Sequence, residues 1–164
     1  MKVWREIAGD TAIVDKVYPV TPPSITVKTG MITGEVIELK VVERVEKGSG
    51  RVVSPARLTG KLRLENTSVN RTVRLVEGRL LFIDMVGQPI KLDAAQTDPI
   101  ITFTKYGNER LDPGKDVSQA LDVEFPVEAL KVNRLREIRL ELAYTASPFR
   151  AETVNFVVTI GAGA

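Results

Sequence analysis

The feature that most constrains this chain is an alternation of apolar and polar residues with a period of two. The clearest run is Leu58–Glu65, in which leucines and one glycine alternate with Thr, Lys, Arg and Glu. Successive side chains of a β-strand point to opposite faces, so a strand with one buried and one wet face needs this pattern. It returns in Ile37–Val41, Leu121–Phe125, Ile138–Tyr144 and Val154–Ile160. The sequence therefore predicts an all-β protein.

Turn-forming residues separate these runs. They occupy Glu46–Gly50, Asn66–Asn70, Asp84–Gly87 and Asp112–Gly114, where Gly, Pro, Asn, Asp and Ser provide the backbone conformations that turns require. Helical character is expected only over Pro126–Asn133, because proline suits a first helical turn. About seven to eight strands with so little helix predict an immunoglobulin-like antiparallel β-sandwich, with a barrel as the alternative. We place Arg57–Gly87 at its centre.

One long strand changes phase part-way along. Val73 and Leu75 hold one phase, whereas Leu80 and Phe82 hold the other. A strand changes phase when it contains an extra residue, so we predict a β-bulge near Val76–Gly78.

The 164 residues suit one domain with an N-terminal extension. Residues 1–33 are predicted to form an arm or edge strand packed on the body, because Pro19, Pro22 and Pro23 cannot donate to a central sheet. Residues 34–164 are predicted to form the β-sandwich domain.

Two aromatic residues lie on the predicted arm, Trp4 and Tyr18. We expect them to pack the arm back onto the body, and anchoring a partner is the alternative. At the other end of the chain, Gly161–Ala164 is expected to fray.

Composition narrows the chemistry. The chain has no cysteine and no histidine, so it has no thiolate nucleophile, no zinc–thiolate site and no imidazole base. The net charge of +2, from 23 basic and 21 acidic residues, is too even to predict nucleic-acid binding.

No stretch approaches the roughly 20 apolar residues of a membrane span. Met1–Glu6 has no apolar signal core, which leaves open a cytoplasmic protein or one whose export signal or anchor was removed.

Acidic residues give the first candidate sites. Asp93, Asp98, Asp112 and Asp116 lie in two loops that could meet at one end of a sandwich, and hard cations need several oxygen ligands at once. Their spacing is not that of an EF-hand, and the turn at Pro113 explains one of them.

The second candidate is the loop tip formed by Asp84 and Gly87, which turn chemistry also explains. Asn66 and Asn70 each begin an Asn-x-Ser/Thr sequence, which matters only in a secreted eukaryotic protein, and the turn explains both. The chain contains no Gly-x-Ser-x-Gly elbow, P-loop or dinucleotide fingerprint. We predict no catalytic, cofactor-binding or metal-ligating residues and no cofactor.

The segment Leu58–Ile90 resembles the FxLYD and late-embryogenesis-type (WHy) β-sandwich domains. The likeness rests on the polar run Asn66–Ser68 and on the hairpin residues Phe82, Asp84 and Gly87. Leu111–Phe125 is similar to the Pro-Gly turn and following strand of such domains, so the resemblance covers about two-thirds of the chain. It implies a non-enzymatic module, often of bacterial or archaeal envelope proteins. On this basis an envelope or periplasmic location is favoured over the cytoplasm.

Three functions follow as hypotheses. The leading one is a structural or protein-interaction module that contacts a protein partner through loops or a sheet edge, for example by strand addition. The second is a carbohydrate- or small-ligand-binding sandwich that uses the end loops Asp93–Pro99 and Tyr106–Gly114. The third is a carboxylate-based hydrolase, which needs two acids about 5–9 Å apart in a cleft. The oligomeric state is left open.

Overall fold

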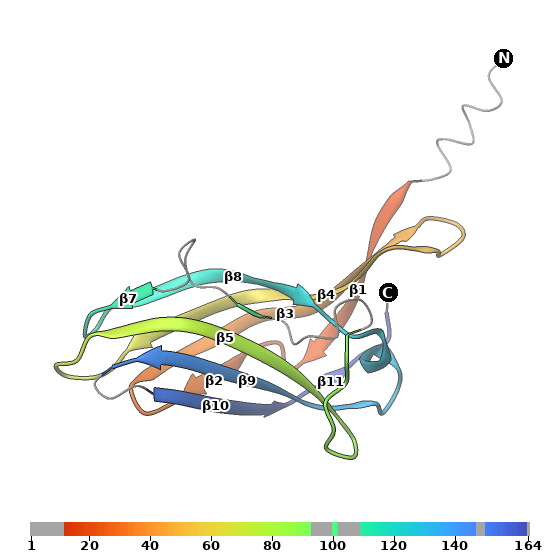
Figure 1. Ribbon diagram of the computed structural model, residues 1–164. Coiled ribbons are helices and arrows are strands. Elements are labelled where there is room, and N and C mark those ends of the chain that lie inside the picture. Colours follow the sequence, from red (N-terminus) through yellow and green to blue (C-terminus); the bar gives the residue numbers. More distant parts are fainter. Residues whose placement is uncertain (1–11, 93–99, 102–108, 147–149, 164) are drawn as a thin grey trace.

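The computed structural model describes residues 12–92, 100–101, 109–146 and 150–163. Two antiparallel sheets pack against each other, which confirms the predicted all-β sandwich (Figure 1). The strands are β1 (Ile13–Thr21), β2 (Ile25–Lys28), β3 (Ile32–Glu46), β4 (Val52–Asn66), β5 (Val73–Asp84), β6 (Ile100–Ile101), β7 (Glu109–Leu111), β8 (Asp116–Glu124), β9 (Leu135–Thr145), β10 (Arg150–Val157) and β11 (Thr159–Ile160). Three of these, β6, β7 and β11, have only two or three residues, which leaves eight longer strands.

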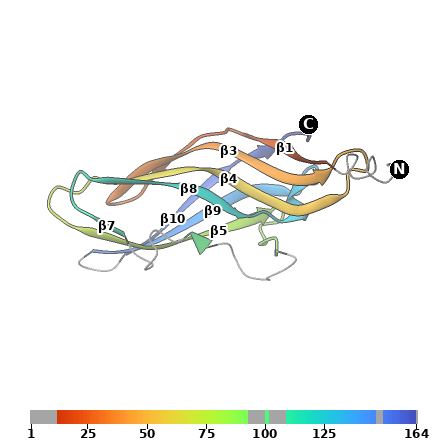
Figure 2. The same ribbon diagram turned by 90° about the horizontal axis from the view of Figure 1, so that it is seen from above.

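The first sheet has the strand order β11-β1-β3-β4-β8, with β2 also paired to β3. The second has the order β10-β9-β5-β6, with β7 also paired to β5. Figure 2 shows the two layers edge-on. Both β4 and β5 have neighbours on each side, so Arg57–Gly87 lies at the centre as predicted. The two strands belong to different sheets, and the Asn66–Asn70 turn carries the chain from one to the other.

The core is built from the inward-facing residues that the alternation marks. Leu58, Leu62 and Leu64 of β4 are at most 2% exposed. Between the sheets, Phe82 of β5 meets Phe125, which directly follows β8, edge to face, with ring centroids 5.0 Å apart. Such a pair contributes about 0.5–1.5 kcal/mol beyond its buried area.

The bulge predicted in the long strand is confirmed. Leu75 of β5 pairs with Tyr144 of β9, and Glu77 pairs with the next residue, Ala143, so Val76 is the extra residue. The inward phase therefore passes from Val73 and Leu75 to the even-numbered positions that follow.

A second bulge interrupts the alternation expected over Ile37–Val41: Leu39 and Val41 are buried and Glu38 and Lys40 are exposed as expected, but Ile37 departs from the pattern. The register of β3 on β4 skips from Ile37 to Lys40, and Glu38 has a φ of 57°. Val36 and Leu39 are consequently buried, while Ile37 is half-buried. The bulge lies where β3 changes its partner on that side: β2 and then β1 pair with β3, and the Leu39 N–H donates to the carbonyl of Pro23 between them (2.9 Å).

The C-terminal segment also differs from expectation. The strand predicted over Val154–Ile160 is two strands in different sheets, divided at the buried Val158. The predicted fraying is not seen in the described part of this segment, Gly161–Gly163, which lies against β1. The Gly161 N–H donates to the Pro19 carbonyl (3.0 Å), and Gly163 lies so near Lys16 that a Cβ there would stand 2.5 Å from the Lys16 Cε.

The N-terminal segment contributes paired strands. Strand β1 pairs with β3 from Ile13 to Pro19, and β2 pairs with the first half of β3. Trp4 lies outside the described residues, and the division of the chain at residues 33 and 34 stays a prediction. The turns and the single helical turn are where the sequence places them: Gly87 and Gly114 have φ of 88° and 80°, and a 3-10 helix spans Val127–Leu130.

Candidate functional site

Exposed apolar side chains gather at one end of the sandwich. At this end β1 and the β3–β4 hairpin project beyond the second sheet as a three-stranded tip, residues 12–16 and 43–54 (Figure 1). Ten large apolar side chains in the described part of the chain are exposed, and nine belong to the tip or to the loops beside it: Ile13, Val14, Val52, Val53, Met85, Val86, Val127, Val132 and Val157. The tenth, Val69, lies in the connection between β4 and β5 at the opposite end. We call this region the apolar end.

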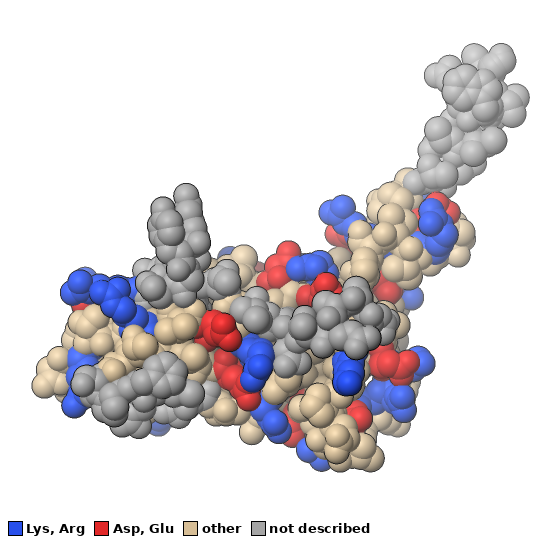
Figure 3. Space-filling view, in the orientation of Figure 1, with Lys and Arg blue, Asp and Glu red and all other residues tan. Residues whose placement is uncertain are grey.

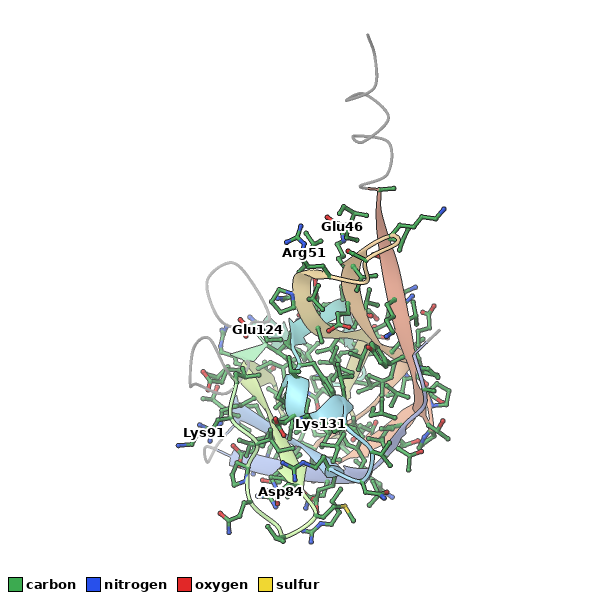
Figure 4. All side chains as sticks on the ribbon, turned by 90° about the vertical axis from the view of Figure 1, so that its right-hand side faces the viewer. Glu46, Arg51, Asp84, Lys91, Glu124 and Lys131 are labelled. Carbon is green, nitrogen blue, oxygen red and sulfur yellow. The ribbon has the colours of Figure 1, made fainter. Side chains whose placement is uncertain are left out.

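A groove of about 400 Å³ lies at the apolar end. The 3-10 segment forms one wall with Leu130 and Val132, and the C-terminal segment forms another with Val157 and Ile160. Figure 4 looks onto this end, with Lys131 and Asp84 nearer the body and Glu46 and Arg51 at the far point of the tip. Val132 and Val157 are 86% and 71% exposed, so the groove has an apolar and accessible rim.

A polar cluster stands where the groove meets the tip. The Tyr18 hydroxyl donates to Glu43 Oε1 (2.9 Å), and Glu43 is only 6% exposed. The Lys16 ammonium lies 5.3 Å from the centre of the Tyr18 ring. Burial and then the hydrogen bond to Glu43 raise the pKa of Tyr18. The cluster therefore fixes the Tyr18 ring as part of the groove wall.

Part of one backbone edge near the groove has no paired strand among the residues that the structure describes. Strand β11 pairs with β1 only at Val20 and Thr21, and Gly161 adds one bond to Pro19. Ile13–Tyr18 pairs with β3 on its other side and with no second strand among the described residues. An unpaired strand edge is a template on which another extended segment can add.

The outer face of the first sheet carries ion pairs. Strand β4 supplies the cations, and the strands on either side supply carboxylates: Arg57 Nε lies 2.5 Å from Asp122 and Lys61 lies 3.4 Å from Glu38. A shallow hollow of about 380 Å³ on this face contains Asp15 and Asp122, which pair with Arg44 and Arg57. Such exposed pairs contribute little to stability, and they form an ordinary solvated sheet face.

The acidic residues singled out in the sequence are not gathered into a site where they are described. Asp112 accepts hydrogen bonds from Thr72 (3.0 Å) and Arg110 (3.1 Å), which in that order lower its pKa. Asp116 pairs with Arg63 at 3.0 Å. Asp93 and Asp98 lie outside the described residues, as do most of the two end loops proposed for ligand binding. Among the residues described, no three acidic side chains are grouped as metal ligands.

The remaining candidates have structural roles. Asp84 Oδ1 accepts the N–H groups of Val86 (3.0 Å) and Gln88 (2.9 Å), so it closes its own turn. Asn66 is fully buried and its side chain makes four hydrogen bonds, whereas Asn70 is exposed. In the folded protein the Asn66 side chain is therefore inaccessible to modification.

The exposed apolar residues were missed in the sequence. A usable signal exists at the tip, because Ile13-Val14 and Val52-Val53 place adjacent apolar residues where a half-buried strand would alternate. Phe156-Val157-Val158 carries the same signal of adjacent apolar residues, whereas nothing comparable marks Val132, which stands between Lys131 and Asn133.

The fold defines the chain as a two-sheet antiparallel β-sandwich protein. None of the helices described is long and apolar enough to cross a membrane. Comparison with protein-family models gives no match, and a search of curated proteins gives none either. The resemblance to FxLYD and WHy domains thus stays a prediction, and the function has to be argued from the apolar end itself.

Proposed function

We propose that the chain is a non-enzymatic protein-interaction module that binds an extended segment of a partner protein at its apolar end. The observation that carries this proposal is the grouping of nine of the ten exposed large apolar side chains around one groove and one tip. Apolar patches larger than roughly a few hundred Å² are rare on monomeric soluble proteins and mark binding sites. Three of the nine residues, Met85, Val132 and Val157, line the groove itself.

The open edge of β1 supports an extended partner. The chain's own β11 already adds to this edge at Val20 and Thr21, and the tail continues along it to Gly161. The next residues of β1, Ile13–Val17, have the same strand geometry and pair with no second strand among the described residues, although Gly163 lies near the side chain of Lys16. Main-chain hydrogen bonds to such an edge give affinity, and pockets beside it select alternate side chains of the added strand.

The groove supports a partner with alternating apolar residues. Its rim residues Val132, Val157 and Met85 are all more than half exposed, and the described lining includes no carboxylate. Apolar side chains of an added strand would remove this surface from water, and burial of apolar area is favourable by about 25 cal/mol per Å².

Selection from a random peptide library tests the proposal. Peptides that bind the wild-type chain are recovered, with counter-selection against a double variant, Val132→Glu with Val157→Glu. We expect the recovered peptides to show alternating apolar residues and to bind the double variant at least about tenfold more weakly, because each glutamate would be buried against apolar side chains. Val69→Glu is the matched control, since Val69 is 93% exposed at the other end of the molecule.

Hydrogen exchange separates strand addition from simple groove binding. Binding by strand addition would slow exchange of amides within Ile13–Val17, whereas the amides of the outer strand β8 would be unchanged. Failure to select any peptide, or binding that Val69→Glu weakens as much as the double variant does, would contradict the proposed function.

The resemblance supports a setting for this module. We propose an immunoglobulin-like, FxLYD-type domain of the bacterial or archaeal envelope, as that likeness implies. Fractionation of source cells, with detection of the native protein, tests this: recovery in the cytoplasmic fraction would contradict it and leave the binding proposal untouched.

A further inference from the structure

Two arginines face each other at the end of the sandwich opposite the apolar end. Arg74 of β5 pairs directly with Arg110 of β7, and on its other side it pairs with Thr145 of β9. Residues directly opposite in antiparallel strands point to the same face, so the three side chains form one row. Like charges in such a pair are destabilising.

A like-charged pair in the other sheet contrasts with this arginine pair. Glu65 and Asp116 are also a like-charged pair directly opposite each other, in β4 and β8. Arg63 bridges them, with its Nη1 at 3.3 Å from Glu65 and 3.0 Å from Asp116. The acidic pair is thus neutralised by a cation of the chain itself.

The arginine pair has no such bridge among the described residues. Asp112 accepts from Arg110 Nε at 3.1 Å and from the Thr72 hydroxyl at 3.0 Å, which orients Arg110 and leaves its terminal nitrogens available. No described carboxylate lies within ion-pair distance of Arg74. By contrast Arg79, further along the same strand β5, lies 2.6 Å from Glu141. Asp112 offsets the charge of Arg110, so the guanidinium that has no carboxylate partner in the described part of the chain is that of Arg74.

The row borders an open hollow of about 420 Å³. Its lining consists of Thr72, Arg74, Arg110, Thr145 and Ala146. The Thr72 hydroxyl donates to Asp112, so of the two threonines in the lining Thr145 is the one whose hydroxyl is not already given to a described carboxylate. Figure 3 shows Lys and Arg atoms gathered over β7 and the start of β5 at the left-hand end.

We infer that this hollow binds a tetrahedral oxyanion, phosphate or sulfate, between Arg74 and Arg110. Guanidinium groups present planar forks of N–H donors that match the oxygens of such an anion, and charge-assisted hydrogen bonds of this kind are about twice as strong as neutral ones. The Thr145 hydroxyl supplies a third donor from the next strand. The anion takes the bridging role that Arg63 has in the acidic pair.

Thermal unfolding and NMR titration of the full chain test the inference. Inorganic phosphate is added at constant ionic strength in place of chloride, and the unfolding midpoint and the amide shifts of Arg74, Arg110 and Thr145 are followed. We expect a saturable rise in midpoint and saturable shifts for the wild type. Arg74→Gln should bind about tenfold more weakly, because it removes one charged fork.

A second variant makes the test independent of phosphate. Arg74→Glu places a carboxylate opposite Arg110, so it should unfold at a higher temperature than the wild type in chloride and show no saturable response to phosphate. Arg79→Gln, on the same strand, is the control and should keep the wild-type response. Non-specific salt stabilisation acts on all variants alike and so cannot produce this pattern.

The ligand source is separated by further arms. Methyl phosphate that binds as well as inorganic phosphate would indicate a phosphate ester on a larger molecule, and binding of inorganic phosphate alone would indicate the free ion. Acetate that binds as tightly as phosphate, unsaturable wild-type shifts, or a full response in Arg74→Gln would overturn the inference. Because these variants lie far from the apolar end, they do not test peptide binding there, and failure of one proposal would leave the other unaffected.

Discussion

Replacement of Asn66 by alanine should be among the most destabilising single changes in the protein. The residue is fully buried at the point where the chain leaves β4 for the opposite sheet. Its amide donates to the carbonyls of Arg71 (2.7 Å) and Leu111 (2.9 Å), and its Oδ1 accepts from the N–H (2.9 Å) and hydroxyl (2.7 Å) of Ser68. One side chain thus ties the β4–β5 connection to the end of β7.

The expected loss follows from these four bonds. Each hydrogen bond contributes a net ~1 kcal/mol, and a buried acceptor left without a donor costs about 1–3 kcal/mol. Once Asn66 is replaced, the single Ser68 O–H is free to donate to the Arg71 carbonyl, whereas the Leu111 carbonyl loses its side-chain partner. Asn66→Ala should therefore lower the free energy of unfolding by roughly 3–5 kcal/mol, a large share of the ~5–15 kcal/mol typical of a domain.

Urea denaturation followed by circular dichroism measures this change. Asn66→Asp keeps the size but loses both donors and buries a charge, so it should be at least as destabilising at neutral pH. Ser68→Ala removes the hydroxyl contacts with Asn66 Oδ1 and with the backbone of Arg71 but keeps the bond from the N–H of residue 68 to Asn66 Oδ1, so it should cost about 1 kcal/mol. Asn70→Ala, at an exposed position in the same turn, should stay within about 0.5 kcal/mol of the wild type. A loss under about 1 kcal/mol for Asn66→Ala would refute the reasoning.

Four other predictions follow from single features of the structure. Gly34→Ala should prevent folding or unfold the protein at ordinary temperatures, because the new Cβ would lie 1.8 Å from the Arg63 carbonyl oxygen; circular dichroism of the purified variant checks this. Phe82→Ala should cost about 3–5 kcal/mol in urea denaturation, since the ring is 1% exposed and packs on Phe125. Burial, followed by the hydrogen bond to Glu43, raises the pKa of Tyr18 in the folded protein. The neutral hydroxyl therefore adds to the free energy of unfolding below about pH 10, and this contribution is lost as pH rises through the folded-state pKa. Denaturation at about pH 9 and about pH 11 should show a smaller decline for Tyr18→Phe than for the wild type. Hydrogen bonds from Lys131 and then Arg134 lower the pKa of Glu128 in the folded protein. The ionised carboxylate therefore adds to the free energy of unfolding above the unfolded-state pKa, and this contribution is lost as pH falls through the folded-state pKa. Glu128→Gln should therefore differ from the wild type at neutral pH and converge with it in acid, and a constant difference would contradict this.

The sequence predicts the sandwich and its centre because one face of each inner strand is buried and the other is wet. It also predicts the bulge at Val76, because both phases of that strand are long enough to be recognised on either side. The bulge at Glu38 escapes such reasoning. Beside it the Leu39 N–H donates to the carbonyl of Pro23, in the connection between β1 and β2, and no pattern within β3 records that partner.

The candidate site was less predictable than the fold for a related reason. Alternation shows which face of β3 and β4 points inward, but it does not show how far the opposing sheet extends. Val14 and Val52 lie on strands whose inner faces are covered further along and open at the tip. The like-charged pair Arg74–Arg110 could not be predicted from the sequence either, because the two residues become neighbours only once β7 is placed beside β5.

The two ends of the sandwich differ in chemistry, and this separates the two proposals physically. Strand β5 begins beside the Arg74–Arg110 pair and ends at the Asp84 turn, next to Met85 in the groove wall, so the length of the strand lies between the sites. Changes at positions so far apart, with no shared partner, normally act additively. A ligand at the basic end that altered peptide affinity at the apolar end would therefore require two global states of the sandwich, related by a coupling free energy. Equal peptide affinity with and without phosphate is the result expected of a rigid sandwich with two independent sites.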